Sequence, residues 1–256
     1  EIARARARLT RALASAAAPS AAKPGLGIRF ERIERRFGAL IALRSLSLEI
    51  APGEFVALLG HNGAGKTTLL RITAQLMRPS RGVVTFFAGI EQQVPFHDVK
   101  GRTGLVGHSL LLYDELSAEE NLTLFSKLYA LDNVSARVAS ALQVCGLSSR
   151  ASSEVRTFSR GMRQRLAIAR ALLHSPSLLL LDEPAAGLDR QGLEWLRVTL
   201  KRLRGDGCTV IMSTHARNES LELATRAIVL VSGRLQQDTG AGGDPRQLLE
   251  SMRAEA

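Results

Sequence analysis

Apolar and polar residues follow two different patterns along this chain. In the first part, apolar residues alternate with polar ones, which is typical of antiparallel strands with one buried face. Later, short runs that are apolar throughout alternate with stretches of helical spacing, as in sheets covered on both faces. The predicted strands are 28–33, 46–50, 55–60, 83–87, 105–107, 177–182, 209–213 and 227–231.

The helical stretches begin and end at recognisable signals. Ser117 followed by Glu120 forms the S-x-x-E pattern of a capping box, so a helix is expected from Ser117 through Leu128. The other predicted helices are 66–77, 134–142, 161–173 and 190–203.

The order of these elements predicts the fold class. Strands that alternate with helices favour an α/β fold around a mainly parallel sheet. The first strands add an antiparallel β subdomain, and residues of about 112–160 form a helical insertion. The sequence contains no internal repeats.

The two ends of the chain differ from its middle in composition. Residues 1–26 are rich in alanine and arginine and poor in acids, so we expect a disordered extension. Residues 27–240 are expected to form one domain, and residues 241–256 a C-terminal tail.

Charge, cysteine content and hydropathy narrow the classes of protein. The net charge of +10 suggests nucleic-acid binding, but half of this excess lies in residues 1–30, which hold six basic residues and one acid. The charge is therefore not a feature of the expected domain as a whole, and we expect no nucleic-acid partner. The two cysteines have no metal-type spacing and fit a reducing compartment. No apolar run approaches the roughly 18 residues that span a bilayer, so any membrane role requires a partner protein.

The stretch GHNGAGKTT, residues 60–68, matches the phosphate-loop pattern G-x-x-x-x-G-K-[ST]. Its glycines let successive backbone N–H groups point at phosphate oxygens, and the following helix begins with positive potential. Lys66 is expected to reach the β- and γ-phosphates, and the Thr67 hydroxyl to hold Mg²⁺. Because the loop lies between an apolar strand and a helix, a simple glycine turn is disfavoured.

A carboxylate pair ends a second apolar strand, in LLLLDEP. Asp182 is expected in the coordination shell of Mg²⁺, and Glu183 could orient or deprotonate an attacking water. Together with the phosphate loop, this pair predicts a nucleotide-hydrolysing site.

Two more segments add phosphate-binding chemistry. Ser159, at the start of a predicted helix and followed by Gly161, leaves backbone N–H groups that suit a phosphate. His215 follows an apolar strand and could contact a γ-phosphate. Taken singly, Ser159 could be an ordinary N-cap and His215 a surface histidine.

With these motifs in this order, residues 28–236 resemble the ATP-binding-cassette (ABC) ATPases. The resemblance implies ATP and Mg²⁺ as cofactors. It identifies Ser159–Gln164 as the family signature, Glu183 as the catalytic glutamate, His215 as the switch histidine and Gly187–Asp189 as the loop between two subunits. The nucleotide-binding positions that it implies are Phe37, which stacks on adenine, Gly60, His61, Asn62, Gly63, Ala64, Gly65, Lys66, Thr67, Thr68, His108, Ser159 and Gly161.

The chain departs from the family pattern at the signature. It contains FSRGM where the family usually has L-S-G-G-Q, so Arg160 and Met162 replace a glycine and a glutamine. Ser159 and Gly161 are retained, and the resemblance therefore implies ATP use while the turnover rate stays open.

His108 falls where these ATPases usually carry a glutamine that contacts Mg²⁺ or water. A GH pair followed by LYDELSAEENL resembles the cytochrome c maturation ATPases, the CcmA type of heme-exporter subunit. The alternative is an ABC-2-type exporter ATPase for a drug, lipid or polysaccharide.

The resemblance also implies an assembly. Two copies form a head-to-tail dimer in which each ATP lies between the Lys66 loop of one copy and Ser159 of the other. Separate transmembrane subunits are the expected partners, and residues 108–130 with the apolar run Leu110–Tyr113 are the expected contact, although the same run could be subdomain core. The expected location is the cytoplasmic face of the cell membrane, peripherally bound.

Two other classes compete with the exporter. A soluble cassette protein acting on nucleic acid or ribosomes usually has tandem cassettes or a long coiled-coil insertion, and this chain shows one cassette without a long heptad run. A non-hydrolysing scaffold is disfavoured because Lys66, Asp182, Glu183 and His215 are all present.

Overall fold

The structure, a computed structural model, describes residues 24–89, 92–214 and 222–240, together with Gly243 and Leu248. Most of the predicted extension, most of the predicted tail and His215 therefore lie outside the described residues. Within the described ranges, no helix has both the length and the apolar character needed to cross a membrane.

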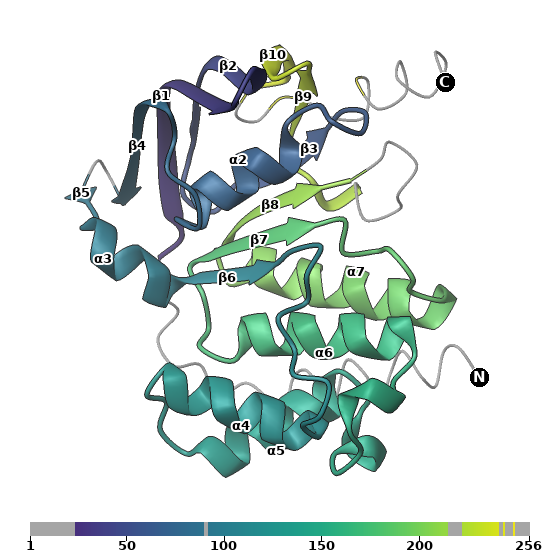
Figure 1. The fold of residues 1–256 in the computed structure, drawn as a ribbon. Coiled ribbons are helices and arrows are strands. Elements are labelled where there is room, and N and C mark those ends of the chain that lie inside the picture. The colour runs from purple at the N-terminus through teal and green to yellow at the C-terminus, as the bar shows by residue number, and fades with distance from the viewer. Residues whose placement is uncertain (1–23, 90–91, 215–221, 241–242, 244–247, 249–256) are drawn as a thin grey trace.

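The centre of the molecule is a six-stranded sheet with the order β10-β9-β3-β8-β7-β6 (Figure 1). Five of these strands run parallel, and β10 pairs antiparallel with β9. The strands are β3 (Phe55–Leu59), β6 (Thr103–Val106), β7 (Leu178–Asp182), β8 (Thr209–Ser213), β9 (Arg226–Val231) and β10 (Arg234–Asp238).

β3 shows why these strands are apolar throughout. It lies between β8 and β9, and all five of its residues are buried. Phe55, Ala57 and Leu59 face one apolar core, whereas Val56 and Leu58 face the other. A strand with both faces covered has no position for a polar side chain.

The second sheet is antiparallel, in the order β2-β1-β4-β5. Its strands are β1 (Leu26–Phe37), β2 (Leu40–Ile50), β4 (Arg81–Ala88) and β5 (Gln92–Gln93). The helix α2 (Lys66–Thr73) shares an apolar core with this sheet and with one face of the parallel sheet. In the view of Figure 1, α2 lies between the two sheets.

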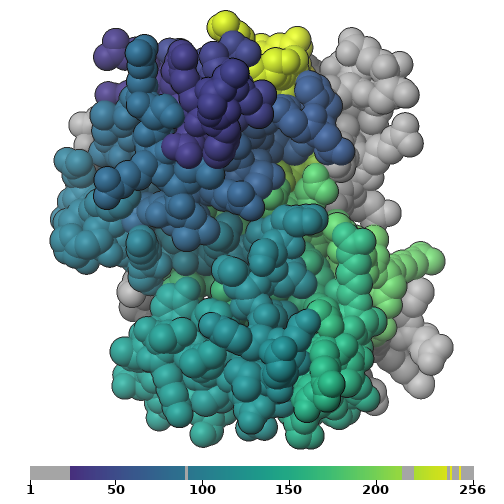
Figure 2. Space-filling view, in the orientation of Figure 1, coloured from purple at the N-terminus to yellow at the C-terminus, as the bar shows by residue number. Residues whose placement is uncertain are grey.

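The helices α6 (Arg160–Leu172) and α7 (Arg190–Gly205) contribute to the other core, together with the opposite face of the parallel sheet. Beyond them lie α4 (Ala118–Leu128) and α5 (Val134–Val144), which form the predicted helical insertion with two short 3₁₀ turns, Ser148–Arg150 and Val155–Thr157. In the space-filling view this helical part forms the lower half of the visible face and the antiparallel sheet the top (Figure 2).

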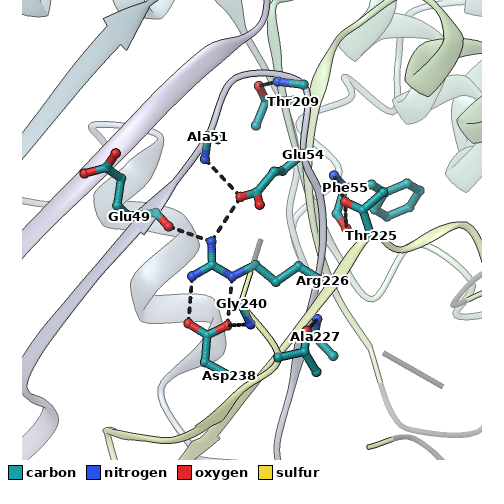
Figure 3. Close-up of polar contacts among 12 residues, drawn as sticks. Glu49, Ala51, Glu54, Phe55, Thr209, Thr225, Arg226, Ala227, Asp238 and Gly240 are labelled. Carbon is teal, nitrogen blue, oxygen red and sulfur yellow. Dashed lines mark hydrogen bonds and ion pairs between the residues drawn. The ribbon is translucent and has the colours of Figure 1, made fainter. Parts of the chain in front are cut away.

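A buried arginine ties the antiparallel sheet to the parallel one (Figure 3). Arg226 of β9 binds both carboxylate oxygens of Asp238 on β10, at 2.8 and 2.7 Å, and a carboxylate oxygen of Glu54 at 3.1 Å. It also donates to the backbone oxygen of Glu49 on β2 at 2.7 Å. The side chain is 8% exposed, so a single cation satisfies acceptors from three segments.

The structure confirms the predicted fold class, and it corrects several boundaries. The predicted strands 28–33 and 46–50 are parts of a longer hairpin, because the β1–β2 ladder continues to the pair Phe37–Leu40. The helix predicted over 66–77 ends at Thr73, since Gln75 adopts φ +57°. The strand β10 was not predicted because its residues are polar and mostly exposed.

Candidate active site

The phosphate loop connects β3 to α2, as the sequence predicts. Gly60 and Gly65 have φ of +143° and +106°. A Cβ on Gly60 would lie 2.4 Å from the backbone oxygen of Leu230, and one on Gly65 would lie 2.7 Å from that of Ala42. Glycine is therefore required at both positions for its conformation and for its size.

The Lys66 ammonium is held inside this loop. Its Nζ donates to the backbone oxygens of Gly60 at 2.6 Å and His61 at 3.1 Å, and the residue is 5% exposed. Burial lowers the pKa of Lys66, while the charges of Glu183 and Asp182 act in the opposite direction. The lysine is thus positioned by carbonyl groups beside two carboxylates, which suits the binding of an anionic phosphate.

Thr67 and Asp182, which are both predicted to hold Mg²⁺, contact each other. The Thr67 hydroxyl donates to Asp182 Oδ2 at 2.8 Å, and the hydroxyl of Ser213 donates to Asp182 Oδ1 at 2.5 Å. A hydroxyl and a carboxylate both offer hard oxygen ligands. Mg²⁺ typically binds one or two protein oxygens, while phosphates and water complete its coordination shell. The residues present therefore fit Mg²⁺.

Glu183 has a strained backbone. It has φ +51°, a left-handed conformation that is uncommon for residues other than glycine. Its N–H lies within hydrogen-bond distance of both the backbone oxygen and the hydroxyl of Ser213, each at 3.1 Å. Such strain clusters at active sites, where surrounding contacts hold one conformation.

Ser159 and Gly161 lie in the helical layer. Ser159 is the N-cap of α6, with its hydroxyl accepting from the Met162 N–H at 3.3 Å. Among the described residues, no hydrogen bond joins Ser159 or Gly161 to the phosphate loop, and α6 and α2 belong to different cores. The structure therefore does not bring the signature and the phosphate loop of one chain together.

Phe37 lies at the end of β1, where the hairpin turns. The hairpin approaches the phosphate loop, because Ala42 and Leu43 of β2 contact the position where Gly65 would carry a Cβ. The Phe37 ring is 42% exposed, and the Arg35 guanidinium lies 4.6 Å from its centre. An exposed aromatic ring thus lies at the turn of the hairpin whose second strand approaches the phosphate loop.

His108 is exposed in the loop that follows β6. Further along the same loop, Leu111 and Tyr113 are 47% and 52% exposed, whereas Leu110 and Leu112 pack against the core. The predicted apolar run thus divides between surface and core. Asp114 pairs with Arg163 of α6 at 2.9 Å, which joins this loop to the signature helix.

The remaining predicted nucleotide-binding positions lie in the phosphate loop or next to it. His61, Asn62 and Gly63 are exposed, Ala64 is buried, and Thr68 is half-buried in the first turn of α2. His215 lies outside the described residues, so its role stays a prediction.

One residue of the cluster around Asp182 was not predicted. Ser213 ends β8 and pairs in register with Asp182 at the end of the neighbouring strand β7. The signal was available, because parallel strands place their carboxyl ends at one edge of a sheet. The adjacency of β7 and β8, however, was visible only in the fold.

Comparison with known proteins agrees with this geometry. The family described as "ABC transporter" matches residues 43–186. The ABC transporter ATP-binding protein NatA of Bacillus subtilis is 40% identical over 199 residues, which cover 76% of this chain and 80% of NatA. Nod factor export ATP-binding protein I of Cupriavidus metallidurans is 35% identical over 227 residues, 88% of this chain and 73% of the relative.

A solved structure agrees over most of the chain. The dimeric ATP-binding cassette MJ0796, in a post-hydrolysis state bound to ADP and Pi, has a TM-score of 0.73 and 27% identity, covering 82% of this chain and 97% of that one. The chain therefore belongs to the ABC transporter family. It is an ATP-binding and ATP-hydrolysing subunit of such a transporter.

Proposed function

We propose that this chain is the ATP-hydrolysing motor of a membrane exporter and works as a head-to-tail homodimer. The observation that carries the hydrolytic part is the cluster of Thr67, Asp182 and Ser213, with the strained Glu183 next to it. The separation of Ser159 from the phosphate loop of its own chain supports the dimer, since a second copy supplies the missing signature. The dimeric cassette among the similar structures adds to this support.

In this mechanism, backbone N–H groups of the loop and the Lys66 ammonium bind the β- and γ-phosphates and neutralise developing charge. Thr67 and Asp182 would hold Mg²⁺, which would withdraw negative charge from the phosphate oxygens when bound. Glu183 orients an attacking water and accepts its proton. Phe37 stacks on the adenine, and His215 contacts the γ-phosphate.

The membrane partner binds through the loop after β6. Leu111 and Tyr113 offer exposed apolar contacts to transmembrane subunits, and His108 hydrogen-bonds the attacking water. The Asp114–Arg163 ion pair connects the same loop to the signature helix, α6. A movement of the transmembrane subunits is therefore transmitted through this loop to α6. We place the chain peripherally on the cytoplasmic face of the cell membrane.

Two classes of cargo follow from different observations. The GH pair at His108 and the LYDELSAEENL stretch favour heme export for cytochrome c biogenesis. The likeness to a Nod factor export protein favours an ABC-2-type exporter of a drug, lipid or polysaccharide, and this alternative has the broader sequence support. ATP turnover in membranes that contain the transmembrane partner separates the two, since only the true cargo stimulates it.

The catalytic assignment is tested by Glu183→Gln. The variant keeps the phosphate contacts of Lys66 and Thr67, so ATP binding should stay within a few fold of the wild type. Steady turnover should fall by at least about 100-fold, the scale of general-base catalysis. With excess ATP the variant should form a stable dimer in size-exclusion light scattering.

A matched control is Glu31→Gln, which removes an exposed carboxylate of β1, outside the phosphate loop and the expected partner contact. It should leave turnover and oligomeric state unchanged. Turnover of Glu183→Gln within a few fold of the wild type would reject Glu183 as the catalytic base.

A further inference from the structure

The first half of α6 packs against the segment that follows Glu183. Gln164, one turn into the helix and 6% exposed, donates from its side-chain Nε2 to the backbone oxygen of Pro184 at 3.1 Å. A buried amide that reaches a backbone carbonyl twenty residues away fixes the distance between two segments. Here the two segments are the signature helix and the turn that carries Glu183.

Two glycines bring the same segments into close contact. A Cβ on Gly161 would lie 3.0 Å from the backbone oxygen of Gly187. A Cβ on Gly187 would lie 2.6–2.8 Å from the Cδ, Cγ and Nε atoms of Arg160, and Gly187 has φ +80°. The side chain of Arg160, the residue that departs from the usual signature, therefore lies across the Gly187 backbone.

The Glu183 turn needs support from both sides because its backbone is strained. On the N-terminal side, Ser213 accepts from the Glu183 N–H. On the C-terminal side, the Ala186 N–H donates to the Glu183 oxygen at 3.1 Å, within the turn itself. Pro184 has no N–H, so its carbonyl oxygen is the backbone group through which it can form a hydrogen bond. Gln164 donates a hydrogen bond to that oxygen.

We infer that Gln164 is a positioning residue for Glu183 and transmits the position of the signature helix to the catalytic carboxylate. The inference rests on the proposed role of Glu183 as the base. When a nucleotide of the second copy binds at the Ser159 end of α6, a shift of the helix moves Gln164, and the Pro184 carbonyl and the Glu183 carboxylate move with it. Hydrolysis then depends on the signature being occupied.

The test is Gln164→Met, which keeps the side-chain length and removes the donor. Since a displacement of about 1 Å can cost 100-fold in rate, kcat per nucleotide-binding site should fall at least about tenfold. KM for ATP and the ATP affinity should stay within about threefold, because the side-chain hydrogen bond of Gln164 goes to Pro184 and, among the described residues, none joins it to the phosphate loop. Normalising kcat to titrated nucleotide sites removes any unfolded fraction from the measurement.

Gln164→Glu is the second variant, which keeps the shape and replaces the donor with an acceptor facing the Pro184 oxygen. Its loss of kcat should equal or exceed that of Gln164→Met. The matched control is Arg165→Met on the same helix, which removes a 2.9 Å hydrogen bond to the backbone oxygen of Cys145 within the helical part. This control should keep the wild-type kcat.

The outcomes separate this inference from the proposed function. If Glu183→Gln keeps turnover, the proposed role of Glu183 fails. If Glu183→Gln abolishes turnover while either Gln164 variant keeps kcat within about twofold, only the positioning role fails. A rise in KM equal to the fall in kcat would also overturn it. Combining Gln164→Met with Glu183→Gln should leave the ATP-dependent dimer intact, because Gln164 acts through Glu183 and not on dimer closure.

Discussion

Replacing Arg226 with methionine tests how the two sheets are held together. The change removes the guanidinium and leaves two carboxylates, Glu54 and Asp238, that are 10% and 22% exposed. Breaking a buried ion pair by removing one partner costs about 3–5 kcal/mol, since the remaining charge keeps its desolvation cost. Asp238 and Glu54 each retain one backbone N–H donor, from Gly240 and Ala51, so we expect the lower end, about 3 kcal/mol.

The assay is thermal and urea unfolding without nucleotide. For a domain of this size, about 3 kcal/mol corresponds to a fall in Tm of roughly 6–12 °C. The control is Arg156→Met, whose ion pair with Glu154 is 68% and 43% exposed, and it should leave the unfolding transition almost unchanged because solvent screens an exposed pair. A loss below about 1 kcal/mol for Arg226→Met would refute the reasoning, because the carboxylates would then be solvated well enough to do without the cation.

The same pair predicts a pH dependence. Burial raises the pKa of Asp238, but the hydrogen bonds and charge of Arg226, together with the Gly240 amide, outweigh burial and lower it overall. A carboxyl with a lowered pKa in the folded state stabilises the protein above its unfolded pKa, about 3.9 for aspartate, and loses this contribution as the pH falls through the folded value. The unfolded state is nearly the same in wild type and Arg226→Met, so the stability gap between them follows the folded carboxyls. It should be constant near neutral pH and narrow on acidification, once the carboxyls that Arg226→Met leaves buried without their cation become protonated. A gap that widens on acidification would contradict this sign.

Two further predictions concern nucleotide use. His108→Ala should keep ATP affinity within a few fold but lower the turnover that the transmembrane partner stimulates. His108→Gln should restore much of this turnover. If the alanine variant behaves like the wild type in membranes, His108 is an ordinary surface residue. Phe37→Leu should raise KM for ATP by about fivefold or more, the loss of one aromatic–base stack, with kcat unchanged; Phe96→Leu, at a 59% exposed phenylalanine outside the β1–β2 hairpin, should leave KM unchanged.

The local chemistry could be predicted from short stretches of the chain. The phosphate loop, the Ser117–Glu120 capping box and the N-cap at Ser159 each depend on residues that are close in sequence, and the structure shows the predicted caps. Thr67 and Asp182 were both predicted to hold Mg²⁺, and the structure shows them in contact although they are far apart in the sequence. Asp182 ends an apolar strand, and Thr67 lies at the start of the helix that follows another. The carboxyl ends of such strands meet at one edge of a parallel sheet.

The sequence by itself determined that the chain has an α/β fold, and it predicted which residues carry the nucleotide chemistry. The tertiary structure decided which strands are neighbours, and with them the contacts of Ser213 with Asp182, of Arg226 with Asp238, and of Gln164 with Pro184. The sequence carried no signal for which elements are neighbours, because hydrophobic periodicity records which face of an element is buried and not which element covers it. The edge strand β10 has no buried face to leave such a pattern, and it is defined only by its pairing with β9.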